Sequence, residues 1–267
     1  MSSSELRLAI HGAAGRMGQR LVALGHADPE IRIAAALDNA RHPSLGADAG
    51  TIAGVGDIGL TIRSALDVEV DAVIDFSVAE AVDAIVATCA ENKIPLVLAT
   101  TGLSETQKAE VERASGKTPI VWAPSMSLAV NLTMKLAQIA GAALKDHPGG
   151  ADVEIIERHH RFKEDAPSGT ALRFGELIAD AMDIRGATHG RQGRPGKRPH
   201  DEIGYHAVRV GDNPGEHTIV FGLLGETLEL RVAASNRDCY ALGALAAAKF
   251  IVKQSPGLYG MSDVLGL

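Results

Sequence analysis

Aromatic residues and cysteines are scarce in this sequence of 267 residues. Phe, Trp and Tyr together account for 3% of the chain, although 46% of its residues are hydrophobic. Ala, Val, Ile and Leu therefore make up the apolar mass, which favours helices packed on a buried sheet over an aromatic-rich binding surface. The two cysteines, Cys89 and Cys239, lie far apart and outside any CxxC pattern. We expect reduced thiols in or near the core rather than a disulfide framework.

An excess of positive charge is also missing, because the formal net charge is −7. This balance argues against a nucleic acid or membrane partner, since either would require a basic face. No segment approaches the roughly 18 consecutive apolar residues of a membrane span. The N-terminus, MSSSELRLAI, lacks the basic region and long apolar run of a signal peptide. Because neither a signal peptide nor a membrane span is found, we expect a cytoplasmic protein. With two distant cysteines and no HExxH motif, we also expect no metal site.

The first 123 residues alternate short apolar runs with helix-length segments. Near-continuous apolar runs are typical of parallel strands that are buried on both faces. Two of the intervening helices are predicted to begin with capping boxes, at Ser77–Glu80 and at Ser104–Gln107. We therefore predict a Rossmann-like, doubly wound α/β domain with a parallel sheet. The predicted strands are Arg7–Ile10, Ile31–Asp38, Asp71–Ser77, Pro95–Thr101 and Pro119–Ala123.

The pattern changes after residue 127, where helices are followed by a group of strands. This grouping predicts a second, α+β domain with a mixed sheet. We expect a dinucleotide-binding domain at 1–127, a substrate-binding and oligomerisation domain at 128–238, and a C-terminal helix and tail at 239–267 that return to the first domain. The predicted elements are helices at 127–144, 169–182 and 239–252, strands at 152–157, 205–210, 217–223 and 227–234, and a loop at 185–199.

The glycines of HGAAGRMG, at Gly12, Gly15 and Gly18, directly follow the first predicted strand and open a helix. Such a turn lets the backbone approach a pyrophosphate closely, and the helix N-terminus offers unpaired N–H groups to the anion. Small residues also occur at ordinary strand-to-helix turns, so the spacing alone is a weak signal. Asp38 strengthens it, because it ends the second strand, where a carboxylate can accept hydrogen bonds from a ribose.

The same carboxylate bears on the choice of coenzyme. Asp38 would repel a 2′-phosphate and so favours NADH over NADPH, while Arg16 and Arg41 soften that preference and the neutral Asn39 tilts slightly toward NADH. The turns at 99–102 and 122–127 follow two further strands, and ligands of open parallel sheets bind outside these carboxyl ends. They are candidates for contacts with the ribose and nicotinamide, with ordinary loops as the alternative.

The segment EIIERHHRFKEDAPSGTA, residues 154–171, combines titratable and small polar groups. Ser168 can cap the helix that follows, which leaves the N–H groups of Gly169 and Thr170 free to bind a carboxylate. Histidine exchanges a proton near neutral pH, and Lys163 can balance negative charge. The alternative is a histidine with a purely structural role. The nearby basic residues form either a mobile cover or a solvated loop, and they are Arg191, Arg194, Lys197 and Arg198.

Over essentially its whole length, the chain resembles the 4-hydroxy-tetrahydrodipicolinate reductases, also called dihydrodipicolinate reductases, of bacterial lysine and diaminopimelate biosynthesis. The resemblance rests on GAAGRMG, on TTG at 100–102, on the long pattern at 154–171, on RVGDNPGEHT at 209–218 and on SNR at 235–237. It implies an NADH- or NADPH-dependent oxidoreductase that converts 4-hydroxy-tetrahydrodipicolinate to tetrahydrodipicolinate and water. It also implies a homotetramer assembled through the sheet of the second domain.

The resemblance implies roles for individual residues. His159 would be the catalytic acid, and Lys163 a proton donor or charge stabiliser. The substrate would be bound by His160, Ser168, Gly169 and Thr170. The cofactor would be bound by Gly12, Ala13, Ala14, Gly15, Arg16, Met17, Asp38, Asn39, Ala99, Thr100, Thr101, Ala123, Pro124, Ser125 and Met126.

Five positions depart from the usual family pattern. Ala99 replaces a frequent Gly, Ser125-Met126 replaces Asn-Phe, Val232 replaces a frequent His, and Asn39 lies where NADPH-using members carry Arg. We expect altered nicotinamide contacts and one polar substrate contact that is absent or relocated. Two other functions fit parts of the sequence. One is a two-domain reductase acting on a different small acid, and the other is a dinucleotide-binding sensor without catalytic activity.

Overall fold

The computed structural model describes residues 5–267, which divide into two compact units. Unit 1 consists of the described residues up to Leu128 together with Arg237–Leu267, and unit 2 consists of Ala129–Asn236. Each unit has its own sheet and its own hydrophobic core. Within residues 5–267, no helix has the length and apolar character needed to cross a membrane.

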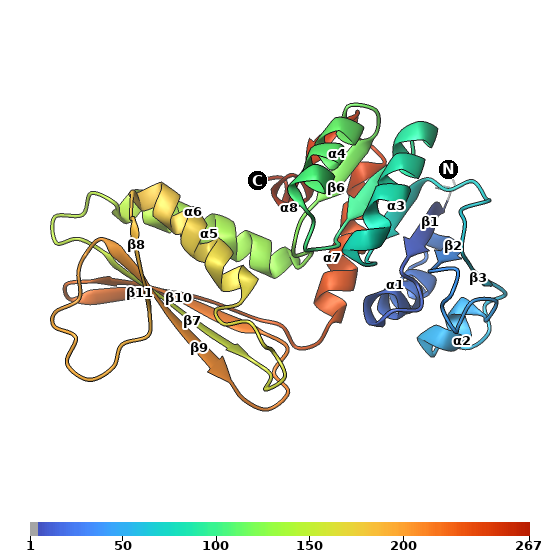
Figure 1. Ribbon diagram of the computed structural model, residues 1–267. Coiled ribbons are helices and arrows are strands. Elements are labelled where there is room, and N and C mark those ends of the chain that lie inside the picture. Colours follow the sequence, from blue (N-terminus) through green and yellow to red (C-terminus); the bar gives the residue numbers. More distant parts are fainter. Residues whose placement is uncertain (1–4) are drawn as a thin grey trace. The chain divides into compact units, whose positions relative to one another are not determined.

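Unit 1 is built on a parallel sheet, as predicted (Figure 1). Its strands are β1 (Leu6–His11), β2 (Ile31–Leu37), β3 (Ile62–Arg63), β4 (Ala72–Asp75), β5 (Leu96–Leu98), β6 (Pro119–Trp122) and β12 (Gly257–Tyr259). Its helices are α1 (Arg16–Ala27), α2 (Ala49–Ala53), α3 (Ala79–Asn92), α4 (Glu105–Ser115), α7 (Asp238–Ile251) and α8 (Met261–Leu265). The strand order is β12-β6-β5-β4-β1-β2-β3, and all the pairings are parallel.

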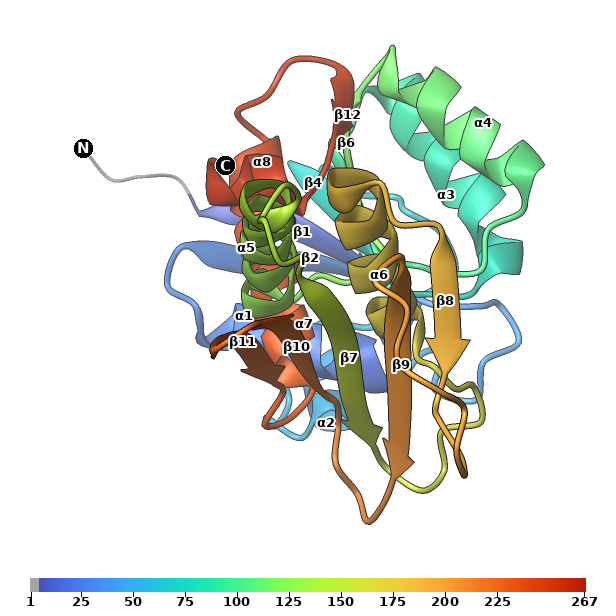
Figure 2. The same ribbon diagram turned by 90° about the vertical axis from the view of Figure 1, so that its left-hand side faces the viewer.

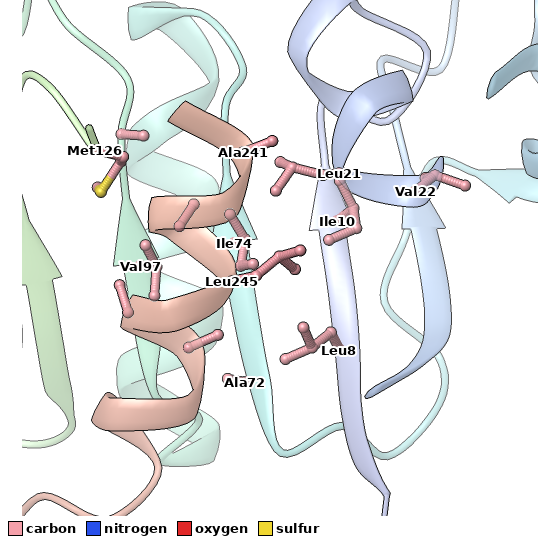
Figure 3. Close-up of a cluster of buried hydrophobic side chains, with 14 of the residues drawn as sticks. Leu8, Ile10, Leu21, Val22, Ala72, Ile74, Val97, Met126, Ala241 and Leu245 are labelled. Carbon is pink, nitrogen blue, oxygen red and sulfur yellow. The ribbon is translucent and has the colours of Figure 1, made fainter. Parts of the chain in front are cut away.

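The sheet of unit 1 is covered on both faces, which explains its near-continuous apolar strands. Leu8 and Ile10 belong to the core on the face covered by α1 and α7, whereas Ala9 belongs to the core on the face covered by α3 and α4. Leu21 of α1 and Leu245 of α7 lie in the first of these cores (Figure 3). The C-terminal helix α7 is thus an integral layer of unit 1.

The two predicted capping boxes have different outcomes. The box at Ser104 is confirmed, because its hydroxyl accepts from the backbone N–H of Gln107 and the Gln107 side chain accepts in return. The prediction of a capping box at Ser77 is wrong, since α3 begins at Ala79 without a side-chain cap. The Ser77 hydroxyl instead donates to the Asp75 carboxylate at 2.7 Å. An unpaired carboxylate is costlier when fully buried, as Asp75 is, than an uncapped helix end that water can reach.

Several short elements escaped prediction because two to five residues carry no readable periodicity. They include β3, β12, α2 and α8. A further strand, β8 (Gly186–His189), lies in the segment that we expected to be a loop. It pairs in parallel with a neighbouring strand, so hydrogen bonding to that strand, rather than local sequence, makes it extended.

Unit 2 contains a mixed sheet, also as predicted, with strand order β11-β10-β7-β9-β8 (Figure 2). Its remaining elements are α5 (Leu128–Leu144), β7 (Asp152–His159), α6 (Gly169–Met182), β9 (Glu202–Arg209), β10 (Glu216–Leu223) and β11 (Glu226–Ala233). Residues of α5 and α6 share a core with one face of this sheet. In β7, Val153 and Ile155 are buried on that face, whereas Ile156 is exposed on the other.

Two arginines of the basic loop are held by the sheet rather than free in solvent. Arg191 and Arg198 each lie 2.8 Å from the Glu154 carboxylate, and Arg198 also donates to Asp152. The expectation of a mobile cover or a solvated loop is therefore wrong for these two side chains. They neutralise a half-buried glutamate on β7, to which His206 also lies within 2.6 Å.

Glu154 should contribute to stability in a pH-dependent manner. Burial acts to raise the pKa of Glu154, but hydrogen bonds from Arg191, Arg198 and His206 lower it to about 2. A lowered pKa stabilises the fold above the unfolded value of about 4.3 and loses this effect as pH falls toward the folded value. We predict that Glu154→Gln reduces the free energy of unfolding by about 3 kcal/mol at pH 7.

Urea unfolding followed by circular dichroism checks this prediction at pH 7 and at successively lower pH. The difference between the wild type and Glu154→Gln should shrink below about pH 4. Glu226→Gln, at the exposed start of β11, serves as the control and should change stability very little. A constant difference across this pH range would contradict the assignment.

Candidate functional site

A cavity of about 610 Å³ lies in unit 1 at the carboxyl ends of β1, β2, β4 and β5. The order of the sheet places β2 on one side of β1 and β4 on the other, so β1 and β4 form a topological switch point. Ligands of open α/β sheets bind at such a point. The cavity is lined by His11, Gly12, Gly15, Arg16, Met17, Asp38, Asn39, His42, Phe76, Ser77, Val78, Ala81, Ala99, Thr100, Thr101 and Pro124.

The glycine turn is shaped by close backbone contacts. Gly12 has a φ of +80°, and a β-carbon on it would lie 2.6 Å from the carbonyl oxygen of Phe76. A β-carbon on Gly18 would lie 2.1 Å from the carbonyl oxygen of Gly12. No described side chain caps α1, whose N-cap is Gly15. The first N–H groups of α1 therefore remain available to an anion, and this cradle fits the pyrophosphate of a dinucleotide.

Asp38 connects the second strand to the glycine turn. One of its oxygens accepts from the backbone N–H of Ala14 at 2.9 Å, and the other accepts from that of Asn39 at 2.8 Å. Each carboxylate oxygen can accept a second hydrogen bond. Since Asp38 also lines the cavity, it can receive the hydroxyl groups of a ribose.

Most of the residues expected to bind a cofactor lie in this lining, but five do not. Met126 is fully buried in the core of unit 1, and Ala13 and Ala123 also belong to that core. Ala14 contributes its backbone N–H to Asp38. The residues absent from the lining are Ala13, Ala14, Ala123, Ser125 and Met126.

Sequence reasoning missed a hydrogen-bonded cluster in the cavity wall. Asp75 is completely buried, and one of its oxygens lies 2.5 Å from His11 Nδ1 and accepts from the Ser77 hydroxyl. Its other oxygen accepts from Thr100 Oγ1 at 2.5 Å. The available signal was an acid at the end of one apolar run and a histidine at the end of another. Only the adjacency of β1, β4 and β5 shows that they meet.

Unit 2 places His159 in a second polar cluster, at the end of β7. Its imidazole is buried, and Nδ1 lies 2.5 Å from the carboxylate of Glu157, which is on the same face of the strand. Burial lowers the pKa of His159, although the Glu157 carboxylate acts in the opposite direction. The ring of His217 on β10 makes an edge contact with that of His159 at a centroid distance of 5.2 Å.

Ser168 caps α6, as expected. Its hydroxyl accepts from the N–H of Ala171 at 3.2 Å, and its own N–H donates to Glu157 at 3.0 Å. The same hydroxyl lies 3.0 Å from Nε2 of His217. Ser168 is thus buried and fully engaged by the protein, whereas Gly169, at the first position of α6, is exposed to solvent.

The remaining predicted residues lie on the loop after β7. Lys163 is mostly buried, and its Nζ donates to Asp165 at 2.8 and 2.9 Å. His160 has a buried Nδ1 that makes no hydrogen bond to any described residue. Val232 on β11 is buried directly opposite His217 on β10. A histidine therefore lies across the strands from the position where the family frequently has one.

Neither unit is arranged for metal binding within the described part of the chain. No group of three or more His, Cys, Asp or Glu side chains in residues 5–267 is placed to hold a metal ion. Cys89 is buried and Cys239 is half-buried, and neither forms a disulfide within the described residues. Burial raises the pKa of Cys89 to about 12, which leaves it unreactive.

Comparisons with known proteins give a consistent result. The family models described as dihydrodipicolinate reductase, N-terminus and C-terminus, match residues 6–126 and 129–265. The curated 4-hydroxy-tetrahydrodipicolinate reductase of Rhodopirellula baltica is 59% identical, over 100% of this chain and 98% of its own length. That of Alkalilimnicola ehrlichii is 45% identical over 98% of this chain and 99% of its own.

A solved structure agrees with these matches. The dipicolinate-bound dihydrodipicolinate reductase from Paenisporosarcina sp. TG-14 has a TM-score of 0.79 and 25% sequence identity, and the match covers 97% of this chain and 99% of the other.

The glycine turn generates a direct prediction about ligand binding. Gly18→Ala should weaken NADH binding at least about tenfold, because the added carbon would collide with backbone atoms of Gly12 and Ala13. Fluorescence titration with NADH checks this result on protein whose circular dichroism spectrum matches that of the wild type. Gly116→Ala, where the nearest atom lies at 3.4 Å, is the matched control. Unchanged affinity of Gly18→Ala would exclude the turn as the cradle.

Proposed function

Because the chain belongs to the dihydrodipicolinate reductase family, we propose that the clusters of units 1 and 2 carry its reaction. The protein is a nicotinamide-dependent oxidoreductase that reduces 4-hydroxy-tetrahydrodipicolinate to tetrahydrodipicolinate and water. The observation that carries the site assignment is the pairing of His159 with Glu157 beside the first residues of α6. A titratable group and an anion-binding helix end occur together there.

The cofactor site is the cavity of unit 1. The N–H groups at the start of α1 bind the pyrophosphate, and Asp38 accepts from the adenosine ribose. Thr100, Thr101 and Pro124, which line the cavity, would contact the other half of the dinucleotide. When bound, the nicotinamide supplies the hydride for the reduction.

The substrate site is at the beginning of α6. The N–H groups of Gly169 and Thr170 bind a carboxylate, which is favoured by the partial positive charge of the helix N-terminus. His160 donates a further hydrogen bond to the dicarboxylate. Ser168 acts indirectly, because its hydroxyl is already bound to Ala171 and His217 and so serves to fix the helix start.

His159 is the proton donor of the reaction, and Lys163 supports it. Glu157 accepts from Nδ1 of His159, which leaves Nε2 as the position that exchanges a proton. The reduction consumes one proton as water leaves, and the protonated form of His159 supplies it from Nε2. Lys163, now paired with Asp165, stabilises negative charge that develops on the substrate.

Two broader features also belong to this proposal. We assign the protein to the cytoplasm and to a homotetramer formed through the second sheet. Helices α5 and α6 pack against one face of that sheet. The other face exposes Ile156 and Val208, apolar side chains that a second copy of the chain can bury.

The two alternative functions retain less support. A dinucleotide-binding sensor has no use for a buried histidine–glutamate pair beside a helix N-terminus. A reductase for another small acid shares the cofactor cavity, but the curated relatives match over the full length of both units. Turnover of freshly prepared 4-hydroxy-tetrahydrodipicolinate, measured against semialdehyde and amino-acid substrates, separates all three functions.

Lys163→Ala should lower kcat at least about a hundredfold while changing the affinity for NADH less than about threefold. The ammonium acts on charge in the transition state, and unit 1 holds the cofactor. Steady-state kinetics and NADH titration check the two quantities. Lys197→Ala, an exposed lysine of the same unit, is the matched control and should retain wild-type turnover. Unchanged kcat in Lys163→Ala would refute this role.

Asp38 should set the coenzyme preference toward NADH, because its carboxylate repels a 2′-phosphate. We expect Asp38→Ser to raise the ratio of kcat/KM with NADPH to that with NADH at least about tenfold. Parallel assays with the two coenzymes measure this ratio. Asp83→Ser, on the exposed face of α3, provides the control. If Asp38→Ser has the same ratio as the wild type, Asp38 does not determine the coenzyme preference.

A further inference from the structure

Glu157 is a buried carboxylate with every acceptor position occupied. One oxygen lies 2.5 Å from His159 Nδ1, and the other accepts from the backbone N–H of Ser168 at 3.0 Å. Only 1% of the side chain is exposed. A single side chain therefore connects the imidazole at the end of β7 to the first turn of α6.

Arg209 on β9 completes the cluster. Its two terminal nitrogens donate to the two oxygens of Glu157, each at 2.8 Å, in the bidentate geometry typical of strong arginine–carboxylate pairs. One of these nitrogens also donates to the backbone carbonyl of Asp165, on the loop that carries Lys163. Burial acts to raise the pKa of Glu157, but the bonds from Arg209 and His159 lower it, so the carboxylate is charged.

A charged carboxylate fixes the hydrogen-bonding state of His159. An ionised carboxylate only accepts hydrogen bonds, so Nδ1 of His159 must carry a proton and donate it to Glu157. The proton that leaves or arrives is then on Nε2. Gly215 lies beside this nitrogen, and a β-carbon there would be 2.9 Å away, so the missing side chain keeps Nε2 approachable.

We propose that Glu157 and Arg209 form a positioning pair, in which Glu157 orients His159 and favours its protonated form while Arg209 opposes that effect. The proposal rests on the role of His159 as proton donor. It goes beyond that role by assigning functions to two residues that do not themselves contact the substrate. The same pair aligns the proton donor with the helix end that binds the carboxylate.

The charges around His159 come from every element packed against it. Glu157 is on β7, Arg209 on β9 and His217 on β10, while Lys163 and Asp165 are on the loop after β7. Burial lowers the pKa of His159 most, Glu157 raises it, and Lys163 and Arg209 lower it. Burial lowers the pKa of His217 to about 4, so this ring is neutral at pH 7.

Two substitutions with opposite charge effects test the pair. Glu157→Gln removes the anion, so the alkaline limb of the pH profile of kcat/KM should move about one pH unit toward acid. Arg209→Met removes the cation that opposes Glu157, so the same limb should move toward alkali. Damage to the fold lowers the rate in both variants but does not move the limbs in opposite directions. Limbs that stay in place, or move in the same direction, overturn the proposal.

Further variants keep the test decisive. Arg209→Lys retains the charge and should restore the limb to its wild-type position, and Glu226→Gln should leave the profile unchanged. If Glu157→Gln does not fold, the alkaline shift of Arg209→Met carries the test, and its absence overturns the proposal. Imidazole ¹⁵N shifts of His159, recorded without substrate, should show a protonated Nδ1 in the wild type and a mixture of tautomers in Glu157→Gln.

The turnover of His159→Gln, together with the NMR measurement, separates this inference from the proposed function. If His159→Gln retains turnover, the role of His159 as proton donor fails, whatever the tautomer. If His159→Gln is inactive but the tautomer and the pH limbs do not respond to Glu157 and Arg209, the positioning pair fails and the proton donor remains.

Discussion

A buried carboxylate must have its hydrogen-bonding capacity filled, and both units of this protein are organised around that requirement. Asp75 in unit 1 and Glu157 in unit 2 are almost completely inaccessible to solvent. Each lies 2.5 Å from the Nδ1 atom of a histidine. Each also accepts from at least one donor on another element of the same unit, Thr100 for Asp75 and Arg209 for Glu157, so each carboxylate links several chain segments.

The two carboxylates position different kinds of binding group. Asp75 joins the ends of β1, β4 and β5, from which the cofactor turns start, through His11, Ser77 and Thr100. Glu157 joins the end of β7 to the N-terminus of α6. In both cases the carboxylate lies at or near the end of a sheet strand, and the groups that we propose to bind a ligand are backbone N–H groups or an imidazole. Such groups bind anions without much reorganisation, which suits a dinucleotide and a dicarboxylate.

The long motif at 154–171 illustrates how far a linear pattern can be interpreted. Its serine was correctly predicted to cap a helix, and the start of that helix at Gly169 was correct to the residue. The same motif contains Glu157, whose role was not recognised because its arginine partner lies far along the chain. Arg209 is 52 positions away, and β9 must lie beside β7 before the two can meet.

The sequence by itself determined the alternation of apolar runs, the glycine turn and the grouping of His159, Lys163 and Ser168 in one segment. These features are local, because strand burial, backbone sterics and helix capping act over a few residues. The tertiary structure alone decided which acid meets which histidine, that Ser77 bonds to Asp75 rather than capping α3, and that Arg191 and Arg198 neutralise Glu154. It also placed Met126 in the core instead of the cavity wall. Those outcomes depend on strand order and on the cost of burying an unpaired charge, and neither can be read from neighbouring residues.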